Sequence, residues 1–460
     1  MLSRRELLSL LKGGLAAILP ARLFAKLWVE AARAQAPRVL VVGAGAAGLA
    51  AARALREAGC DVIVLEARDR TGGRIWTDRT LDAVPLDLGA SWIHGVRGNP
   101  VTALAEANGI ARARTNHERR QIALGTGGRL TAAQVTRYDE AFAALLEAAA
   151  EVAEASPRDL SLAEALAQAQ AQSGRELDEA LRLHLAHAVT VEIEHTYAAD
   201  AAALSAWYWD EAEEFDGGDA IFPGGYDWLP RALAEDLDVR LNTRVVAVRY
   251  DARGVQVETG QGTFSADYAV ITAPLGVLKA GTIRFEPALP AATQRAIDRL
   301  TFGTLNKLYL RFPESFWDAR VTWIDLIDPA RRWRSFVNLQ PVLGAPVLLG
   351  FIAGTAALEA ETHPDAALVE DALASLRAIH GARIPAPDGW RITRWASDPF
   401  ALGAYSSYGV GSHPADRIAL GTPVAGRLVF AGEAAHAEFP GTVHGALLSG
   451  WAAAQALIRS

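Results

Sequence analysis

Sulfur is almost missing from this chain, whose 460 residues include one cysteine and one methionine. The lone cysteine, Cys60, permits no internal disulfide and no zinc site built from cysteines, so packing alone has to stabilise the fold. Hydrophobic residues make up 51% of the chain and charged residues 21%, which excludes disordered, collagen-like and coiled-coil proteins. A chain of this length is expected to form two large domains or about three smaller ones.

An excess of positive charge is missing as well. The 53 acidic residues outnumber the 45 basic ones, and the formal net charge is -8. This balance excludes a nucleic-acid-binding protein that relies on overall positive charge. We therefore expect no nucleic-acid partner, and we assign no residue to a metal site.

Long hydrophobic runs are also missing, including at the start of the chain. The first apolar stretch, 7–19, is interrupted by Lys12 and two glycines, and is shorter than the ~20 residues that a spanning helix needs. We expect no stable membrane span. Paired arginines followed by a weakly apolar run and small residues resemble a twin-arginine export signal. We expect 1–36 to be a leader, cut after Ala34, and the protein to be periplasmic or secreted. A retained amphipathic helix over 23–34, with a cytoplasmic protein, is the alternative.

A dinucleotide-binding pattern follows the leader. An apolar run at 38–42 predicts a strand that leads into the glycine turn Gly43–Gly48, and 49–58 predicts a helix. A second buried strand is predicted at 60–65 and ends at Glu66, where an acid can bind ribose hydroxyls. The glycines permit a tight turn and close approach of a pyrophosphate, which the helix N-terminus attracts. Strand, helix and acid in register indicate a bound dinucleotide.

The segment after Glu66 distinguishes FAD from NAD. Residues 66–74, Glu-Ala-Arg-Asp-Arg-Thr-Gly-Gly-Arg, resemble the extended signature of FAD-dependent amine oxidases. From here the chain resembles the flavin amine oxidase family, most closely its polyamine oxidase branch, over roughly 37–458. The other motifs that carry the resemblance are 87–95, 306–312, 430–433 and 439–446.

The resemblance implies an α/β fold in which a Rossmann-like FAD-binding domain is interleaved with an α+β substrate domain that carries a mixed sheet. We expect the FAD-binding domain to consist of 37–95, 220–285 and 420–460, and the substrate domain of 96–219 and 286–419. From the residues themselves, strands are predicted at 239–250, 255–259 and 268–273, and helices at 132–155 and 160–187.

The same resemblance implies which residues hold the cofactor. They are Gly43, Gly45, Ala47, Gly48, Glu66, Arg68, Gly73, Arg74, Gly89, Ala90, Ser91, Trp92, Val245, Trp395, Gly432, Glu433, Thr442 and Val443. Relatives that bind FAD covalently have a cysteine directly before the tyrosine that matches Tyr405. This chain has Ala404 at that position. We therefore expect non-covalent FAD.

Four residues match catalytic positions of the family. The lysine matching Lys307 holds a water against flavin N5, and a cation there can assist reoxidation by oxygen. Tyr405 and Phe439 match two aromatic residues that flank the substrate nitrogen, although the family often has tyrosine at the second position. His94 lies in a segment that animal polyamine oxidases place near the substrate, where a histidine can bind or deprotonate an amine.

An acidic stretch between His184 and Asp219 points to the substrate. Carboxylates spaced along a tunnel would attract a polycation, and Glu192 and Glu194, next to apolar residues, are the best candidates for the inner end. A solvated acidic surface is the alternative.

These features predict FAD-dependent oxidation of an amine C–N bond. The family implies hydride transfer to flavin N5, which gives an imine and then an aldehyde and an amine, with oxygen reduced to hydrogen peroxide. A polyamine is the favoured substrate. Aromatic or heterocyclic amines, L-amino acids, a cytochrome as electron acceptor, and a non-catalytic FAD-binding scaffold are the alternatives.

Overall fold

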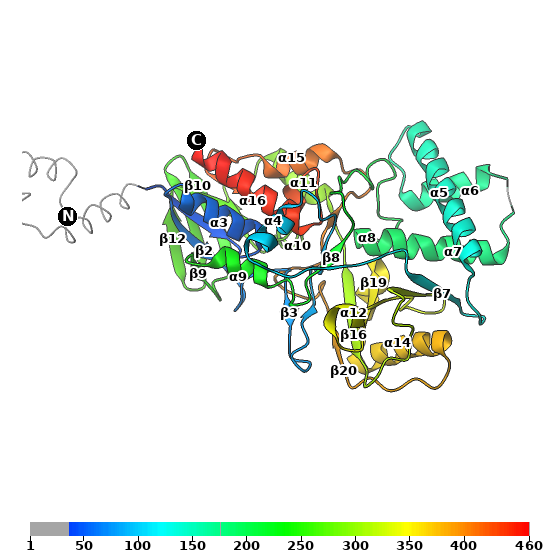
Figure 1. The fold of residues 1–460 in the computed structure, drawn as a ribbon. Coiled ribbons are helices and arrows are strands. Elements are labelled where there is room, and N and C mark those ends of the chain that lie inside the picture. The colour runs from blue at the N-terminus through cyan, green and yellow to red at the C-terminus, as the bar shows by residue number, and fades with distance from the viewer. Residues whose placement is uncertain (1–35, 175, 460) are drawn as a thin grey trace, which may run out of the picture.

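The computed structural model describes residues 36–174 and 176–459, so the expected leader, 1–36, lies almost entirely outside the described residues (Figure 1). Within the described part of the chain, every helix is too short or too polar to cross a membrane.

A parallel five-stranded sheet forms one end of the molecule. Its strands lie in the order β22 (Leu428–Phe430), β13 (Tyr268–Ile271), β1 (Arg38–Val42), β2 (Asp61–Leu65) and β9 (Asp238–Arg240). Distant parts of the chain therefore pair side by side, each in parallel register. Helices α3 (Ala46–Glu57) and α16 (Val443–Ile458) pack together on one face (Figure 1). In such sheets ligands bind beyond the carboxyl ends of the strands, here at the turn between β1 and α3.

A second sheet covers the other face of the parallel sheet. It has the order β12 (Gly262–Ala266), β11 (Gly254–Thr259), β10 (Val245–Asp251) and β14 (Arg284–Glu286). Apolar side chains of β1 pack against those of β10 and β11 in one core. The single strand predicted over 239–250 is wrong, because a turn with Asn242 at φ 54° separates β9 from β10.

A mixed six-stranded sheet lies at the centre of the other half of the molecule. The order is β20 (Gly389–Ile392), β16 (Leu305–Arg311), β19 (Val347–Ala353), β18 (Ser335–Asn338), β17 (Trp323–Ile327) and β7 (Arg120–Leu124). Only β17 and β7 pair in parallel. Helix α14 (Asp365–His380) covers one face, packing on Leu308, Leu310 and their neighbours. The residues that alternate with these along β16, Lys307 and Tyr309, therefore point to the opposite face.

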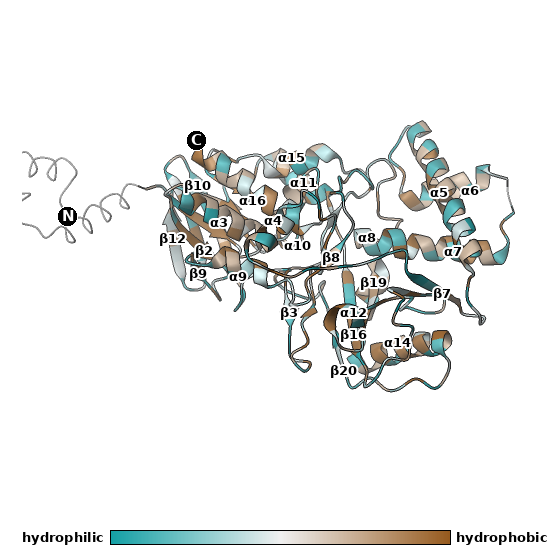
Figure 2. Ribbon diagram, in the orientation of Figure 1, coloured by the Kyte–Doolittle hydropathy of each residue, from teal (hydrophilic) through white to brown (hydrophobic). Residues whose placement is uncertain are grey.

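A group of helices flanks this sheet. It consists of α5 (Ala132–Ala155), α6 (Leu162–Gln172), α7 (Glu179–Ala188), the π-helix η2 (Val189–Glu194) and α8 (His195–Tyr197). Figure 2 shows both hydrophilic and hydrophobic residues along α5, as expected for a helix that packs on one side. The single helix predicted over 160–187 is wrong: Ser161 and Asp178 cap two separate helices by accepting backbone N–H groups.

Short elements connect these units. They are β3 (Thr77–Asp78), β4 (Leu86–Asp87), β5 (Trp92–Ile93), α4 (Pro100–Ala107), β6 (Ala113–Arg114), β8 (Ala220–Ile221), α9 (Trp228–Ala234), α10 (Leu275–Lys279), α11 (Ala291–Arg299), β15 (Thr301–Phe302), α12 (Gln340–Leu343), α13 (Gly354–Ala360), β21 (Ser406–Ser407), α15 (Pro414–Gly421) and η3 (Glu433–Ala435). The expected α/β fold with a mixed sheet is confirmed, while the five segment boundaries of the two domains stay a prediction.

Candidate active site

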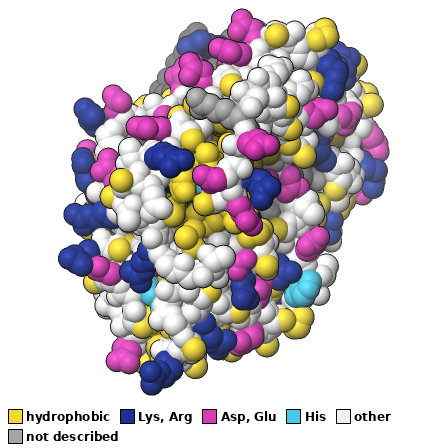
Figure 3. All heavy atoms as spheres, turned by 90° about the vertical axis from the view of Figure 1, so that its right-hand side faces the viewer, with side chains coloured by type: hydrophobic (Ala, Val, Ile, Leu, Met, Phe, Trp, Pro, Cys, Tyr) yellow, Lys and Arg dark blue, Asp and Glu magenta, His cyan; other side chains and the backbone are white. Residues whose placement is uncertain are grey.

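One elongated cavity of about 620 Å³ joins the two halves of the fold. At one end it is lined by the glycine turn after β1, and at the other by Lys307, Phe351 and Trp323 of the six-stranded sheet. Seen from the side that carries the helical group, the surface has a hollow with hydrophobic side chains, and acidic and basic side chains stand around it (Figure 3). A cavity of this shape can hold a long cofactor and a second molecule beyond it.

The glycine end is built for close approach of a phosphate group. Gly43 has φ 107°, and a Cβ on Gly48 would lie 1.9 Å from Gly43 O, so both positions require glycine. Gly45 begins α3 without a side-chain cap and is open on its cavity side. The first N–H groups of α3 are therefore free to bind an anion. Gly48 itself packs below the turn and does not line the cavity.

Glu66 stands beside this turn and is fixed by the backbone. Its carboxylate accepts hydrogen bonds from Ala44 N at 2.7 Å and Arg68 N at 2.8 Å. Arg68 in turn forms a two-pronged ion pair with Asp398, at 2.9 and 2.8 Å. Asp398 was not expected from the sequence, because nothing near it in the chain indicates a partner 330 residues away.

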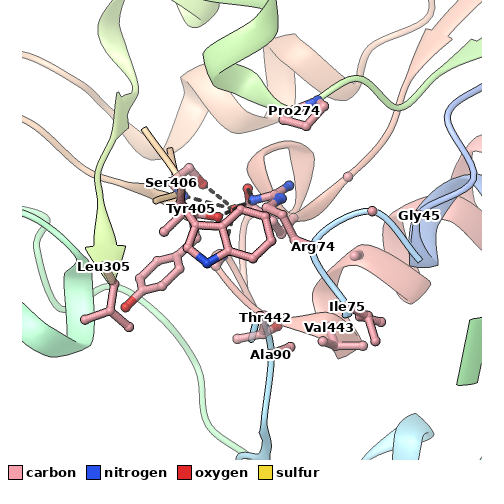
Figure 4. A pocket seen from close by; sticks show the side chains of 18 of the residues that line it. Gly45, Arg74, Ile75, Ala90, Pro274, Leu305, Tyr405, Ser406, Thr442 and Val443 are labelled. Atoms are coloured by element: carbon pink, nitrogen blue, oxygen red, sulfur yellow. Dashed lines mark hydrogen bonds and ion pairs between the residues drawn. The ribbon is translucent and has the colours of Figure 1, made fainter. Parts of the chain in front are cut away.

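Glu433 organises the middle of the cavity. Its carboxylate accepts hydrogen bonds from Arg74 at 2.8 Å, Ser406 Oγ at 2.5 Å and Gly441 N at 2.9 Å. Burial alone would raise the pKa of Glu433, but the Arg74 charge and the Ser406 hydrogen bond outweigh it and hold the pKa below its ordinary value. Figure 4 shows Arg74, Ser406 and Thr442 converging on this space.

Lys307 is buried, with 4% of its surface exposed, on β16 between β19 and β20. It therefore lies in the sheet interior and not on an edge strand. Its ammonium donates to Asp87 O at 2.9 Å, Gly89 O at 2.5 Å and Ser91 Oγ at 2.5 Å. Burial lowers the pKa of Lys307, and the nearby Asp87 carboxylate opposes that effect.

Asp87 is a functional candidate that the sequence reasoning passed over. Its buried carboxylate accepts hydrogen bonds from Thr77 Oγ1 at 2.5 Å and Tyr226 N at 2.9 Å. Burial raises the pKa of Asp87, and these hydrogen bonds and the Lys307 charge counteract it. The sequence did contain a signal for Asp87, because this residue begins the motif that contains Gly89 and Ser91. Its partner Tyr226, however, is distant in the chain.

The remaining predicted cofactor residues reach the same cavity. Seventeen of the eighteen residues assigned to the cofactor, all but Gly48, line it, including Ala47, Gly73, Ala90, Trp92, Val245, Trp395, Gly432 and Val443. Trp395 is held by a hydrogen bond from its Nε1 to Leu88 O at 3.1 Å. The open helix N-terminus, the glycine turn and the fixed acids fit FAD.

The two predicted aromatic walls do not both face the cavity. Tyr405 lines it and donates its hydroxyl hydrogen bond to His195 O at 2.8 Å. Phe439 does not line it, because its ring stacks on Phe215, with centroids 4.6 Å apart and planes at 9°. The same segment presents Thr442 to the cavity instead. Sequence position alone could not show which residue of this loop turns inward.

His94 lies at the outer part of the cavity with 57% of its side chain exposed. Its Nδ1 is 3.0 Å from Asp219 Oδ2, and His117 Nε2 is 3.4 Å from the same oxygen. Burial raises the pKa of Asp219, but hydrogen bonds from the two histidines outweigh this and bring the pKa well below its ordinary range. His94 is therefore placed to meet an incoming molecule, with its ring fixed by a carboxylate.

Only one of the two carboxylates predicted to bind substrate lines the cavity. Glu192 lines the cavity from the π-helix and pairs with Arg120 at 3.1 Å. Glu194 points elsewhere: it does not line the cavity, and it accepts a hydrogen bond from Ala201 N at 3.2 Å. Two further acids of the predicted acidic stretch, Glu213 and Glu214, do line the cavity. Residues two apart on a helix point to different sides, which explains the split.

The fold and this cavity define a flavin-dependent oxidoreductase with a deep site for a small organic molecule. Within the described residues, no group of three or more histidine, cysteine or acidic side chains is arranged to hold a metal ion.

Comparison with known proteins identifies the family. The sequence model of the flavin containing amine oxidoreductases matches residues 46–458, and the chain belongs to that family. It is an FAD-dependent amine oxidase. Polyamine oxidase 2 of Arabidopsis thaliana is 37% identical over 441 residues, covering 93% of this chain and 89% of that protein. Lysine-specific histone demethylase 1 homolog 1 of Oryza sativa subsp. japonica is 37% identical, and the match spans 52% of its length.

The solved structures support the fold. Wild-type putrescine oxidase bound to putrescine has a TM-score of 0.75 at 23% identity, covering 92% of this chain and 99% of that one.

Proposed function

We propose that the substrate is an amine with at least two positive charges, a diamine or polyamine, and that oxygen is the electron acceptor. The observation that carries this proposal is the acidic and aromatic lining of the cavity outside the residues assigned to the cofactor. Four carboxyl groups belong to it, from Glu192, Glu213, Glu214 and Asp325, alongside the aromatic rings of Trp323 and Phe351. Carboxylates and aromatic faces both attract ammonium groups.

The proposal assigns a separate role to each of the residues around the reaction centre. Tyr405 and Thr442 form walls that position the reacting carbon and exclude water. Lys307 Nζ holds a proton next to the carbonyl oxygens of Asp87 and Gly89 and can stabilise negative charge on reduced oxygen. His94, held by Asp219, is placed to accept a proton from an incoming ammonium. FAD supplies the two-electron acceptor when it is bound.

The amino-acid alternative is less well supported by the cavity. An amino acid requires an arginine free to bind its carboxylate. Arg120, the arginine beside Glu192, already pairs with Glu192 and with Asp139. A peptide lysine substrate, as the name of the demethylase relative suggests for that protein, carries a single side-chain ammonium, which could pair with only one of Asp325, Glu213 and Glu214, the acids among these four that Arg120 does not already pair with.

Anaerobic titration tests the substrate class. The flavin absorbance of the purified holoenzyme should bleach with spermidine or putrescine much faster than with tyramine or an L-amino acid. Bleaching by tyramine alone, or by an amino acid alone, would contradict the proposal. Admitting oxygen should restore the absorbance and release hydrogen peroxide; return of colour only with an added cytochrome would contradict oxygen as acceptor.

We also propose that the chain is exported, as the paired arginines Arg4 and Arg5 and the small residues before Ala34 support. Expression of the full chain and N-terminal sequencing of periplasmic protein provide the test. A mature protein that retains Met1 in the cytoplasm would contradict export.

A further inference from the structure

Asp325 differs from the other three acids of the cavity lining outside the cofactor residues, because its carboxyl group is buried. It lies on β17, with 4% of its surface exposed, and it lines the cavity. Its Oδ1 atom is buried and forms no hydrogen bond in the structure; the neighbouring Ser335 hydroxyl, which is also unpaired, acts to lower the pKa of Asp325. A buried, unpaired polar atom costs free energy, so its presence at a cavity wall indicates a ligand that supplies the partner.

The register of the sheet relates Asp325 to Lys307. Lys307 on β16 pairs with Phe351 on β19, and Asp325 on β17 pairs with Ser335 on β18. The β18–β19 register, extended by one residue, places Ser335 opposite Phe351. These four residues thus form one row across the sheet and share one face. Three strand spacings separate the ends of the row, so the Cα atoms of Lys307 and Asp325 are ~14 Å apart.

The surroundings of Asp325 favour a cation. The charged groups that face it are Arg120 from β7 and Glu192 from the π-helix. Arg120 pairs with Glu192 and with Asp139 of α5, so its charge is already neutralised twice. Burial lowers the pKa of His195 to about 4 and that of His187 to about 3, so both histidines are neutral near pH 7. None of these groups brings an unpaired positive charge to Asp325.

Aromatic rings complete the wall. Trp323, two residues before Asp325, stacks on Phe351 with centroids 6.1 Å apart and on Trp92 at 6.5 Å. Ring faces attract ammonium groups, and apolar walls accommodate the methylene chain between two nitrogens.

We propose that Asp325 binds the second, unreactive ammonium group of the substrate, while the reacting nitrogen lies at the Lys307 and Tyr405 end of the cavity. This inference rests on the proposed function and names the residue that selects substrates with two charges. Burial raises the pKa of Asp325 to about 7, and a bound ammonium would favour the ionised carboxylate.

Substrate pairs that differ only in the second nitrogen test the proposal. Diaminoalkanes and monoalkylamines of matched chain length are compared by kcat/KM with the wild-type holoenzyme, Asp325→Asn and the control Glu211→Gln. The control removes one exposed negative charge that does not line the cavity. For Asp325→Asn we expect kcat/KM to fall by about 10- to 100-fold with the diamines, the range of a charged hydrogen bond, and to stay unchanged with the monoamines. Glu211→Gln should change neither.

Two further measurements support the test: the first does not depend on activity, and the second does not depend on how a variant folds. In the dithionite-reduced holoenzyme, which cannot oxidise amines, the diamine should raise the melting temperature of wild type more than that of Asp325→Asn. In wild type alone, kcat/KM should pass through a maximum as the diamine lengthens, because the two nitrogens have to span a fixed row.

The outcomes separate the inference from the proposed function. Equal losses with diamines and monoamines, or no loss with either, would overturn the role of Asp325 while leaving amine oxidation intact. A wild-type enzyme that oxidises neither series would overturn the proposed function and this inference with it.

Discussion

Replacing Lys307 with methionine separates the two half-reactions of the enzyme. The change keeps most of the unbranched apolar stem but removes an ammonium that donates to Asp87 O, Gly89 O and Ser91 Oγ. It also leaves the Asp87 carboxyl buried without its cation, so we expect a loss of about 3–5 kcal/mol in the free energy of unfolding. Loss of a preorganised charge next to reacting oxygen should slow reoxidation by about 10²- to 10³-fold.

Stopped-flow absorbance measures each half-reaction in Lys307→Met. Anaerobic mixing with amine gives the rate of flavin reduction, which should change little, because Lys307 is not expected to contact the reacting carbon. Mixing the reduced enzyme with oxygen gives the reoxidation rate, which should carry most of the effect.

Lys279 supplies a matched control. Its ammonium also donates three hydrogen bonds, to the carbonyl oxygens of Ile297, Asp298 and Leu300 at 2.7–2.8 Å, but it does not line the cavity. Lys279→Met should therefore lower stability without slowing reoxidation. Equal slowing of reduction and reoxidation in Lys307→Met, or the same reoxidation defect in Lys279→Met, would refute the role assigned to Lys307.

Three further predictions concern the cofactor and the buried acids. Glu433→Gln removes the negative charge that pairs with Arg74 and should lower the flavin-to-protein absorbance ratio. Glu438→Gln, at an exposed neighbouring position, should leave the ratio unchanged. An unchanged ratio in Glu433→Gln would contradict a cofactor role for Glu433. Denaturation with acid should release all flavin into the supernatant, because Ala404 offers no thiol; flavin that stays on the chain would contradict this. Burial raises the pKa of Asp325 to about 7 in the folded protein, whereas an aspartate in an unfolded chain has a pKa of ~3.9, so this group reduces stability as pH rises between those values. Asp325→Asn should thus gain melting temperature relative to wild type between those pH values, and a constant difference would contradict the raised pKa.

Local motifs were sufficient to predict the cofactor end of the site. Gly43, Gly45 and Glu66 act within one strand–turn–helix–strand unit, so their spacing in the chain fixes their spacing in the structure. Lys307 and Glu433 were assigned by family position, and the structure places both at the cavity.

Contacts between distant segments were not predictable in the same way. Asp87 meets Tyr226 and Lys307 only after the two halves of the fold come together. Asp325 occupies a strand that reads as an ordinary apolar run with one acid, and only the sheet register puts it in a row with Lys307. Nothing in the local sequence shows which of Glu192 and Glu194, two residues apart on the π-helix, faces the cavity. The orientation of Phe439 depends on Phe215, which is more than 200 residues away.

The row from Lys307 to Asp325 makes chain-length preference a discrete property. Its ends are separated by whole strands, so moving the carboxylate along the row changes the span only in steps of ~4.8 Å. A family member with its acid one strand nearer, at the position of Ser335, would select a shorter diamine. Its lysine and its cofactor-binding residues could stay the same. Length selectivity could then diverge through single substitutions on the sheet, without rebuilding the catalytic end.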